Sequence, residues 1–198
     1  MKNKAIAHTS TAAVLLLPAL ALAHADGAAH AHGGFMAGLL HPFTGADHLA
    51  AMLAVGVWSA LAVRPVWMAP LAFLLLLAVG AVAGFLGVAV PAVEPMIAAS
   101  LLVLGLLVAQ RRRLPVAAAA ALTGLFAFFH GAAHGTELGG SGHPWMVAAL
   151  AGMLLGTAVL HAAGIALGQA VVARHRWIAL ATGLGTALLG AGLLVRMA

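Results

Sequence analysis

Six long apolar stretches, separated at charged residues and prolines, constrain the fold of this chain more than any other feature. They cover residues 42–63, 66–89, 96–110, 114–135, 145–170 and 177–195. A helix needs about 20 apolar residues to cross the hydrocarbon core of a bilayer. Because backbone polar groups in lipid must be satisfied within the segment, each stretch predicts a membrane-spanning helix. The third stretch is short and is expected to extend at one end.

The composition excludes an ordinary soluble domain. Hydrophobic residues make up 64% of the chain and charged residues 7%, against about 25% charged in typical globular domains. We therefore expect an all-α integral membrane protein, a bundle of about six transmembrane helices in a lipid bilayer. The chain has no cysteine, which excludes disulfides, thiolate metal sites and cysteine nucleophiles. It also lacks a GxxxxGK[ST] phosphate-binding loop, and its sparse positive charge does not predict nucleic-acid binding.

The N-terminus has the pattern of a secretory signal peptide. Lys2 and Lys4 form a basic region, residues 12–22 an apolar region, and residues 23–25 an A-x-A cleavage site. The mature chain would then begin at Asp26, outside the cytoplasm; an uncleaved anchor helix is the alternative. The predicted organisation is a signal peptide at 1–25, a histidine-containing outer tail at 26–40 and a six-helix transmembrane domain at 41–198.

The arginines predict how the spans are oriented. With the mature N-terminus outside, the cytoplasmic loops contain Arg64, then residues 111–113, then Arg174 and Arg176, while Arg196 stays outside. This bias follows the positive-inside rule. It predicts a multi-pass protein of the bacterial cytoplasmic (inner) membrane.

Glycines repeat four residues apart at several places in the spans. The pairs are Gly80 and Gly84, Gly131 and Gly135, Gly152 and Gly156, and Gly164 and Gly168. Small residues at this spacing let helices approach closely. We interpret the pairs as packing sites within the bundle, with a dimerisation face as the alternative; the sequence does not define the oligomeric state.

Two acidic residues, Asp47 and Glu137, lie inside or at the edge of a span. A charged residue at the bilayer centre is unfavourable by roughly 2.5–3.5 kcal/mol, so each needs a partner. In the first span the segment HPFTGADHLAAM places His41 before the helix and Asp47 and His48 about two turns into it. His41 and His48 are seven residues apart, which puts them on one face if the helix reaches His41. Met52 lies one turn further and is interpreted as a packing residue.

The fourth span ends in the segment FHGAAHGTE. His130 and His134 are i, i+4 neighbours on one helix face, and Glu137 extends that face by about a turn. The first span runs inward and the fourth outward, so both polar groups are expected at similar depth near the outer surface. Two such helices could enclose one ion. Imidazole and carboxylate without thiolate suit borderline divalent metals such as Ni²⁺, Co²⁺ or Zn²⁺; a hydrogen-bonded core histidine or helix cap is the alternative for any single residue.

Four further histidines are weaker candidates for metal contact. His30 and His32 lie in the N-terminal tail and could bind metal loosely. His143 begins the fifth span and either completes the site or caps the helix. His161 lies deeper and is either a station on the exit route or a packing or hydrogen-bonding residue.

The segments HPFTGADHLAAMLAVGVW and FHGAAHGTE resemble the two signatures of the HupE/UreJ family of nickel permeases. The resemblance implies inward movement of Ni²⁺, or of Co²⁺, for hydrogenase or urease maturation. It implies a transporter and not an enzyme, with no permanently bound cofactor and with hydrogenase or urease maturation proteins as candidate partners. The metal-contacting residues that it implies are His41, Asp47, His48, His130, His134 and Glu137.

Two other functional classes fit the same residues. An intramembrane zinc hydrolase can also use a His-x3-His pair with Asp and His from another span. A metal sensor, or a binding subunit that moves nothing by itself, is the third class. Without ATP machinery, transport would be facilitated or secondary, and the identity of the ion and of any coupling ion stays open.

Overall fold

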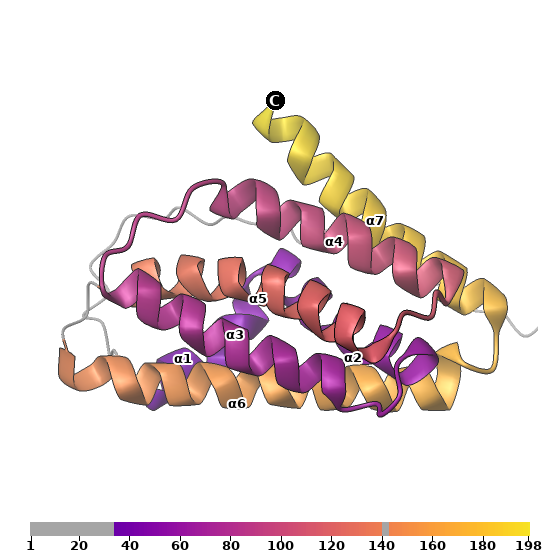
Figure 1. The fold of residues 1–198 in the computed structure, drawn as a ribbon, viewed down its shortest axis with the longest axis horizontal. Coiled ribbons are helices and arrows are strands. Elements are labelled where there is room, and N and C mark those ends of the chain that lie inside the picture. The colour runs from indigo at the N-terminus through magenta and orange to yellow at the C-terminus, as the bar shows by residue number, and fades with distance from the viewer. Residues whose placement is uncertain (1–33, 140–142) are drawn as a thin grey trace, which may run out of the picture.

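The computed structural model describes residues 34–139 and 143–198, and its regular elements there are all helical (Figure 1). They are α1 (Phe35–Thr44), α2 (Ala46–Ala62), α3 (Met68–Phe85), α4 (Val93–Gln110), α5 (Val116–Gly139), α6 (His143–Leu167), the π-helix η1 (Gly168–Val172) and α7 (Arg176–Met197). This confirms the predicted all-α class. The signal peptide, His30 and His32 lie outside the described residues.

The described helices provide five or six membrane spans. Helices α3, α4, α5, α6 with η1, and α7 are each long and apolar enough to cross a bilayer. Together, α1 and α2 are long and apolar enough to form one further span, which is bent by 85° at the break between them. The short third stretch extends at its N-terminal end to Val93, as its length required. The chain is therefore a multi-pass membrane protein.

The first span differs from the expectation in its start and its continuity. It begins at Phe35 instead of residue 42, so residues 35–40, which we had assigned to the outer tail, are helical. His41 lies in the last turn of α1 and does not precede a helix. Pro42 lacks an N–H donor, and α1 ends two residues after it. His41 and His48 are therefore on two helices at a sharp angle, and not on one face of a continuous helix.

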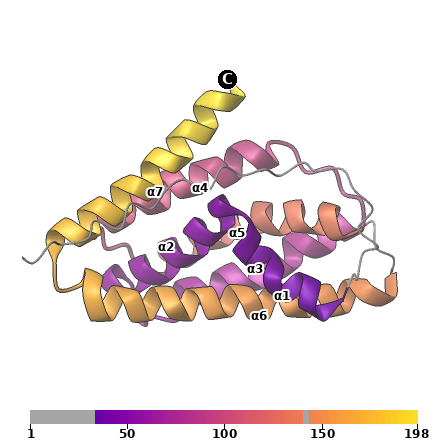
Figure 2. The same ribbon diagram turned by 180° about the vertical axis from the view of Figure 1, so that it is seen from behind.

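The bundle is organised around the central helix α2. Every residue from 54 to 60 is buried, which requires neighbours on all sides of the helix. Along their lengths, α1 and α2 both pack on α6, and α2 also packs on α4 (Figure 2). Helix α3 packs on α5, and α7 packs on α4. The helices on both sides of the break in the first span are thus held by α6.

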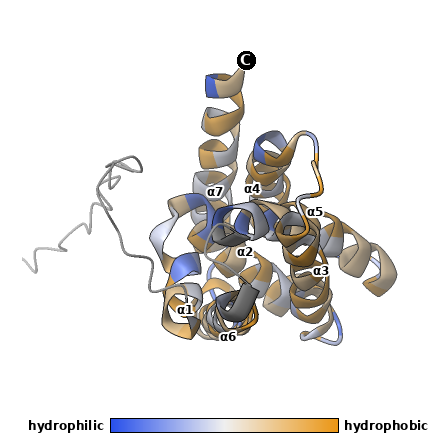
Figure 3. Ribbon diagram, turned by 90° about the vertical axis from the view of Figure 1, so that its left-hand side faces the viewer, coloured by the Kyte–Doolittle hydropathy of each residue, from blue (hydrophilic) through white to orange (hydrophobic). Residues whose placement is uncertain are grey.

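The helices consist mostly of apolar residues (Figure 3), and many large apolar side chains face outward. Leu188 and Val195 of α7 and Val147 of α6 are largely exposed. An exposed apolar surface of this extent is what a lipid-facing bundle requires.

The repeated glycines are contact points between helices of this chain. A Cβ atom on Gly80 would meet the backbone of Phe128 in α5, and one on Gly131 would meet Leu77 in α3. Gly152 lies in the same way against Phe35 of α1, and Gly164 against Leu53 of α2. These contacts support the interpretation of packing within the bundle.

We expect Gly80→Ala to lower the free energy of unfolding by about 1–3 kcal/mol, the usual effect of overpacking a tight contact. The added methyl group would collide with backbone atoms of α5, which cannot rotate away. Gly185→Ala in α7 is the matched control, because nothing lies within 4 Å of its Cβ position. Thermal unfolding in detergent measures both. Equal melting temperatures for the two variants would contradict this packing.

The arginine-bearing loops gather at one end of the bundle. Trp58 Nε1 donates a hydrogen bond to the Arg112 carbonyl at 2.9 Å, and Arg111 donates one to the Val172 carbonyl at 2.6 Å. Arg64 and Arg113 line one cavity there. The positive charges that we used to orient the chain are therefore clustered in space.

Candidate metal centre

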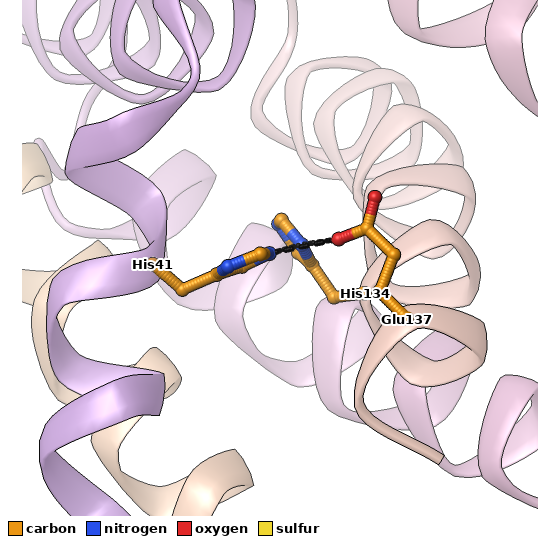
Figure 4. A group of neighbouring side chains, drawn as sticks. All are labelled: His41, His134 and Glu137. Carbon is orange, nitrogen blue, oxygen red and sulfur yellow. Dashed lines mark hydrogen bonds and ion pairs between the residues drawn. The ribbon is translucent and has the colours of Figure 1, made fainter. Parts of the chain in front are cut away.

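His41 in α1 meets His134 and Glu137 in α5 at one point (Figure 4). His41 Nε2 lies 2.8 Å from His134 Nδ1 and 2.9 Å from Glu137 Oε2. His134 Nδ1 lies 3.7 Å from the same Glu137 oxygen. Two imidazole nitrogens and one carboxylate oxygen therefore converge from two helices that are far apart in the sequence.

These separations are close to those of atoms that share an ion. Two ligand atoms that each lie about 2.1 Å from one metal are about 3.0–3.4 Å apart at octahedral or tetrahedral angles. The three observed distances bracket this range. Among the described residues, this is the group whose ligand atoms all lie within 4.8 Å of one another. Small side-chain shifts would bring all three atoms around one ion.

The group forms a gradient of exposure from surface to interior. The Glu137 side chain is 58% exposed, that of His41 27% and that of His134 2%. Beside Glu137 lies a cavity of about 420 Å³ between the start of α4 and the end of α5. Glu94 lies in the first turn of α4 and also lines this cavity. The carboxylate of Glu137 is thus the part of the group that an approaching cation meets first.

Asp47 and His48 form a second pair at the start of α2. One Asp47 oxygen accepts hydrogen bonds from the His48 backbone N–H at 2.8 Å and from His48 Nδ1 at 2.9 Å. The proton of His48 is therefore on Nδ1, and Nε2 keeps its lone pair. Nε2 is buried and has no hydrogen-bond partner within the part of the chain that the structure describes. A ring nitrogen oriented in this way by a carboxylate is typical of metal-binding histidines.

His48 connects the first group to His130. Its ring centroid lies 4.4 Å from that of His134 and 5.0 Å from that of His130. His130 is completely buried in α5, and its Nδ1 has no hydrogen-bond partner among the described residues. All six residues predicted from the two motifs therefore form one connected cluster, although only three of them share a common point.

The cluster continues inward through an aromatic ring. Phe73 of α3 packs against His130, with ring centroids 5.7 Å apart, and against His161 of α6 at 5.0 Å. His161 is 2% exposed, and neither of its ring nitrogens has a hydrogen-bond partner in the described segments. Thr157, one turn earlier in α6, is also buried, and its hydroxyl has no hydrogen-bond partner among the described residues. This disfavours the alternative in which hydrogen bonding alone explains His161.

Sequence reasoning missed two residues that touch the cluster. Phe73 carries no signal in an apolar span, because it looks like any other core residue. Ser100 bonds His130 and is a buried hydroxyl flanked by apolar residues on both sides in the sequence. That isolation in the span was its only signal. Met52 is buried in the core, as expected of a packing residue. His143 begins α6 as predicted, but its side chain is outside the described part of the structure.

The glycines beside these residues have two different roles. Gly45 separates α1 from α2 in an extended conformation, so it marks a real break in the helix. A Cβ there would meet the Asp47 and His48 side chains. Gly131 and Gly135 instead let α5 lie directly against the α3 backbone. The first glycine breaks a helix beside the site, and the other two position the helix that carries His130 and His134.

Comparison with known proteins identifies the family. The family described as "HupE / UreJ protein" matches residues 12–194, nearly the whole chain. The chain belongs to the HupE/UreJ family. It is also 44% identical over 192 residues to "Protein HupE" of Rhizobium leguminosarum bv. viciae, which covers 94% of this chain and 96% of that protein. No solved structure matches the chain.

Membership of the HupE/UreJ family supports metal transport as the role of this chain and does not support an enzymatic one. A transporter carries its metal as cargo, so this role requires no bound cofactor. The converging imidazoles and carboxylate have the chemistry that such a cargo requires.

Proposed function

We propose that this protein is a secondary transporter that moves a divalent transition metal, Ni²⁺ or alternatively Co²⁺, into the cytoplasm. The observation that carries the proposal is the convergence of His41, His134 and Glu137 at one point beside a broken membrane span. The family supports metal transport, and the resemblance of the two motifs to nickel permeases favours nickel. Imidazole and carboxylate also bind other divalent ions, so the choice of ion is part of the proposal.

The proposed metal route uses both motifs in order. Glu137 attracts the hydrated ion at the mouth, and His41 and His134 replace part of its water. His48 and His130 offer the next nitrogen lone pairs, with Asp47 orienting His48. His30 and His32 would capture metal in the tail, and His143 would act at the outer surface. The carboxylates offset the charge of the dication, which lowers the free energy of entering a low-dielectric bundle.

The broken span suggests how the ion is released inward. Discontinuous helices at the middle of the membrane are a common feature of secondary transporters, where one part of the bundle rocks against another. Here α1 contributes His41 and α2 contributes His48, on either side of Gly45. A change in the angle at this break would separate His41 from α5 and transfer the ion to His48 and His130.

The proposed setting is the cytoplasmic membrane of a bacterium. Cleavage of the signal peptide at 1–25 would leave the tail and the mature N-terminus outside, and residues 41–198 would supply most of the transmembrane domain. The clustering of Arg64, Arg111 and Arg113 at one end supports a cytoplasmic position for that end. Recipients of the metal would be hydrogenase or urease maturation proteins.

Uptake by the purified protein in liposomes tests this function. Ni²⁺, Co²⁺ and Zn²⁺ are supplied separately outside, and the metal inside is measured over time, with protein-free liposomes as the blank. We expect saturable uptake of Ni²⁺ or Co²⁺ that Asp47→Ala and His130→Ala both reduce. Retention of one metal per chain without uptake would contradict transport and favour a sensor or binding subunit. Hydrolytic turnover that requires bound Zn²⁺ would favour the intramembrane hydrolase.

We expect His161→Ala to lower the maximal rate of uptake by about tenfold while the concentration for half-maximal uptake changes little. His161 packs against Phe73, on the inner side of the cluster, and is not part of the outer group formed by His41, His134 and Glu137. Its loss would therefore slow the passage of the ion and not its capture. A loss of one metal-nitrogen contact worth about 1.4 kcal/mol corresponds to this tenfold change. Initial rates over a range of metal concentrations separate the two parameters. An increase in the half-maximal concentration alone would place His161 in the capture site instead.

A further inference from the structure

We propose that Ser100 is a positioning residue that holds His130 with its proton on Nε2 and so leaves Nδ1 free to bind the transported metal. The inference rests on the proposed function, but its central observation concerns the protein without metal. Ser100 lies in α4, two turns in from its start, and is completely buried. Its contact with His130 joins α4 to the cluster on α2 and α5.

The direction of this hydrogen bond follows from the number of protons. Ser100 Oγ lies 2.6 Å from the Ile97 carbonyl oxygen and 3.0 Å from His130 Nε2. A hydroxyl has one proton to donate and two lone pairs. The carbonyl can only accept, and at the shorter distance it receives the hydroxyl proton, as is common for serine inside a helix. The hydroxyl therefore accepts the second bond, and the proton in that bond is on His130 Nε2.

The other ring nitrogen of His130 is then a lone pair in a dry interior. Nδ1 is buried and has no hydrogen-bond partner in the described residues. Two rings pack against the His130 ring: that of His48 of α2, at 5.0 Å between centroids, and that of Phe73 of α3, at 5.7 Å. The Phe73 ring has no hydrogen-bonding side-chain atom, and the free nitrogen of His48 is itself a lone pair. A lone pair that nothing else uses is available to a cation.

Ser100 and Asp47 therefore have matching roles on two neighbouring rings. Asp47 fixes the proton of His48 on Nδ1 and frees Nε2, whereas Ser100 fixes the proton of His130 on Nε2 and frees Nδ1. The two rings are perpendicular, at 87°. Loss of either partner would let the proton move to the nitrogen that the ion needs. Mutation of a residue that orients a metal-binding histidine typically lowers metal affinity or activity by about 10- to 100-fold.

Three variants separate this role from a general effect on packing. Ser100→Ala removes the acceptor, and Ser100→Thr keeps the hydroxyl. Ser59→Ala is the matched control: Ser59 is also completely buried, and its hydroxyl donates to the Val66 carbonyl near the arginine-bearing end. In liposomes we expect Ser100→Ala to raise the metal concentration for half-maximal uptake by about tenfold. Ser100→Thr should retain near wild-type uptake, and Ser59→Ala should leave this concentration unchanged.

The position of the proton can be read without metal or transport. Nitrogen NMR of histidine-labelled protein in lipid distinguishes the two neutral forms, and loss of a signal in His130→Gln assigns His130. We expect the Nε2-protonated form in the wild type and a mixture in Ser100→Ala. A wild-type proton on Nδ1, or an unchanged spectrum in Ser100→Ala, would overturn the proposal even if the protein transports metal. A protein that transports nothing but shows the expected spectra would overturn the proposed function, while the effect of Ser100 on the proton of His130 would stand.

Discussion

Replacing His134 by alanine is expected to reduce metal uptake by at least about 100-fold. His134 Nδ1 faces His41 and Glu137, and its ring also packs against His48. His134 therefore belongs to the outer group and also connects that group to His48. Loss of an orienting partner alone changes metal affinity or activity by about 10- to 100-fold, so loss of a direct ligand should reach or exceed the upper value. Initial rates of uptake in liposomes measure the effect.

His175→Ala is the matched control for this variant. It makes the same substitution at an exposed histidine that precedes α7, near the arginine-bearing loops. We expect wild-type uptake from it. Because His134 is buried, the thermal unfolding of His134→Ala should be measured in parallel. Normal uptake by a folded His134→Ala protein would contradict the proposed site.

Glu137→Gln should reduce uptake by about 10- to 100-fold with little change in stability. The glutamine carbonyl can still accept the hydrogen bond from His41 Nε2, so the local geometry is preserved. What is lost is the negative charge, which offsets the charge of a dication entering the bundle. The effect should appear mainly as a higher metal concentration for half-maximal uptake, because Glu137 is the most exposed member of the group.

Glu137→Asp separates the effect of the negative charge from the effect of side-chain length. It keeps the carboxylate but shortens the side chain by one methylene, so we expect activity between those of the wild type and Glu137→Gln. Equal loss in both variants would mean that the charge of the carboxylate and the length of the side chain are both required. Full activity in Glu137→Gln would remove Glu137 from the metal route.

The sequence was sufficient to predict the helical class and the membership of the cluster, because both depend on local chemistry. Long apolar stretches can only be helices in lipid, and a buried carboxylate needs a partner, which led from Asp47 and Glu137 to the nearby histidines. Five of the spans occur close to their expected places. The common depth of the two motifs made a shared site possible, and the contact between them is seen only in the structure.

The break in the first span could not be predicted from residue types alone. The segment His41-Pro42 has the pattern of a helix start, and the similar segment at His143 does start a helix. In α1 the proline lies near the end of a helix that begins at Phe35. Which role applies depends on the packing of α1 along α6, where Gly152 meets the Phe35 backbone. That contact joins residues more than a hundred positions apart, beyond the reach of local patterns.

The same limit explains why the division of roles within the cluster was not foreseen. Side-chain spacing placed His41 and His48 on one face, whereas the 85° bend puts His41 with α5 and leaves His48 beside His130. Ser100 entered the site only through the contact between α4 and α5. Local sequence therefore identified most of the clustered polar groups, and tertiary packing decides which of them converge at one point.

The central claim is that the transported ion first binds between α1 and α5. Anomalous diffraction from crystals loaded with one equivalent of Ni²⁺, recorded at the nickel absorption edge, locates that ion directly. We expect the strongest peak between His41 Nε2, His134 Nδ1 and Glu137 Oε2, within about 2.0–2.2 Å of each atom. A strongest peak away from these three residues, with none between them, would contradict the account.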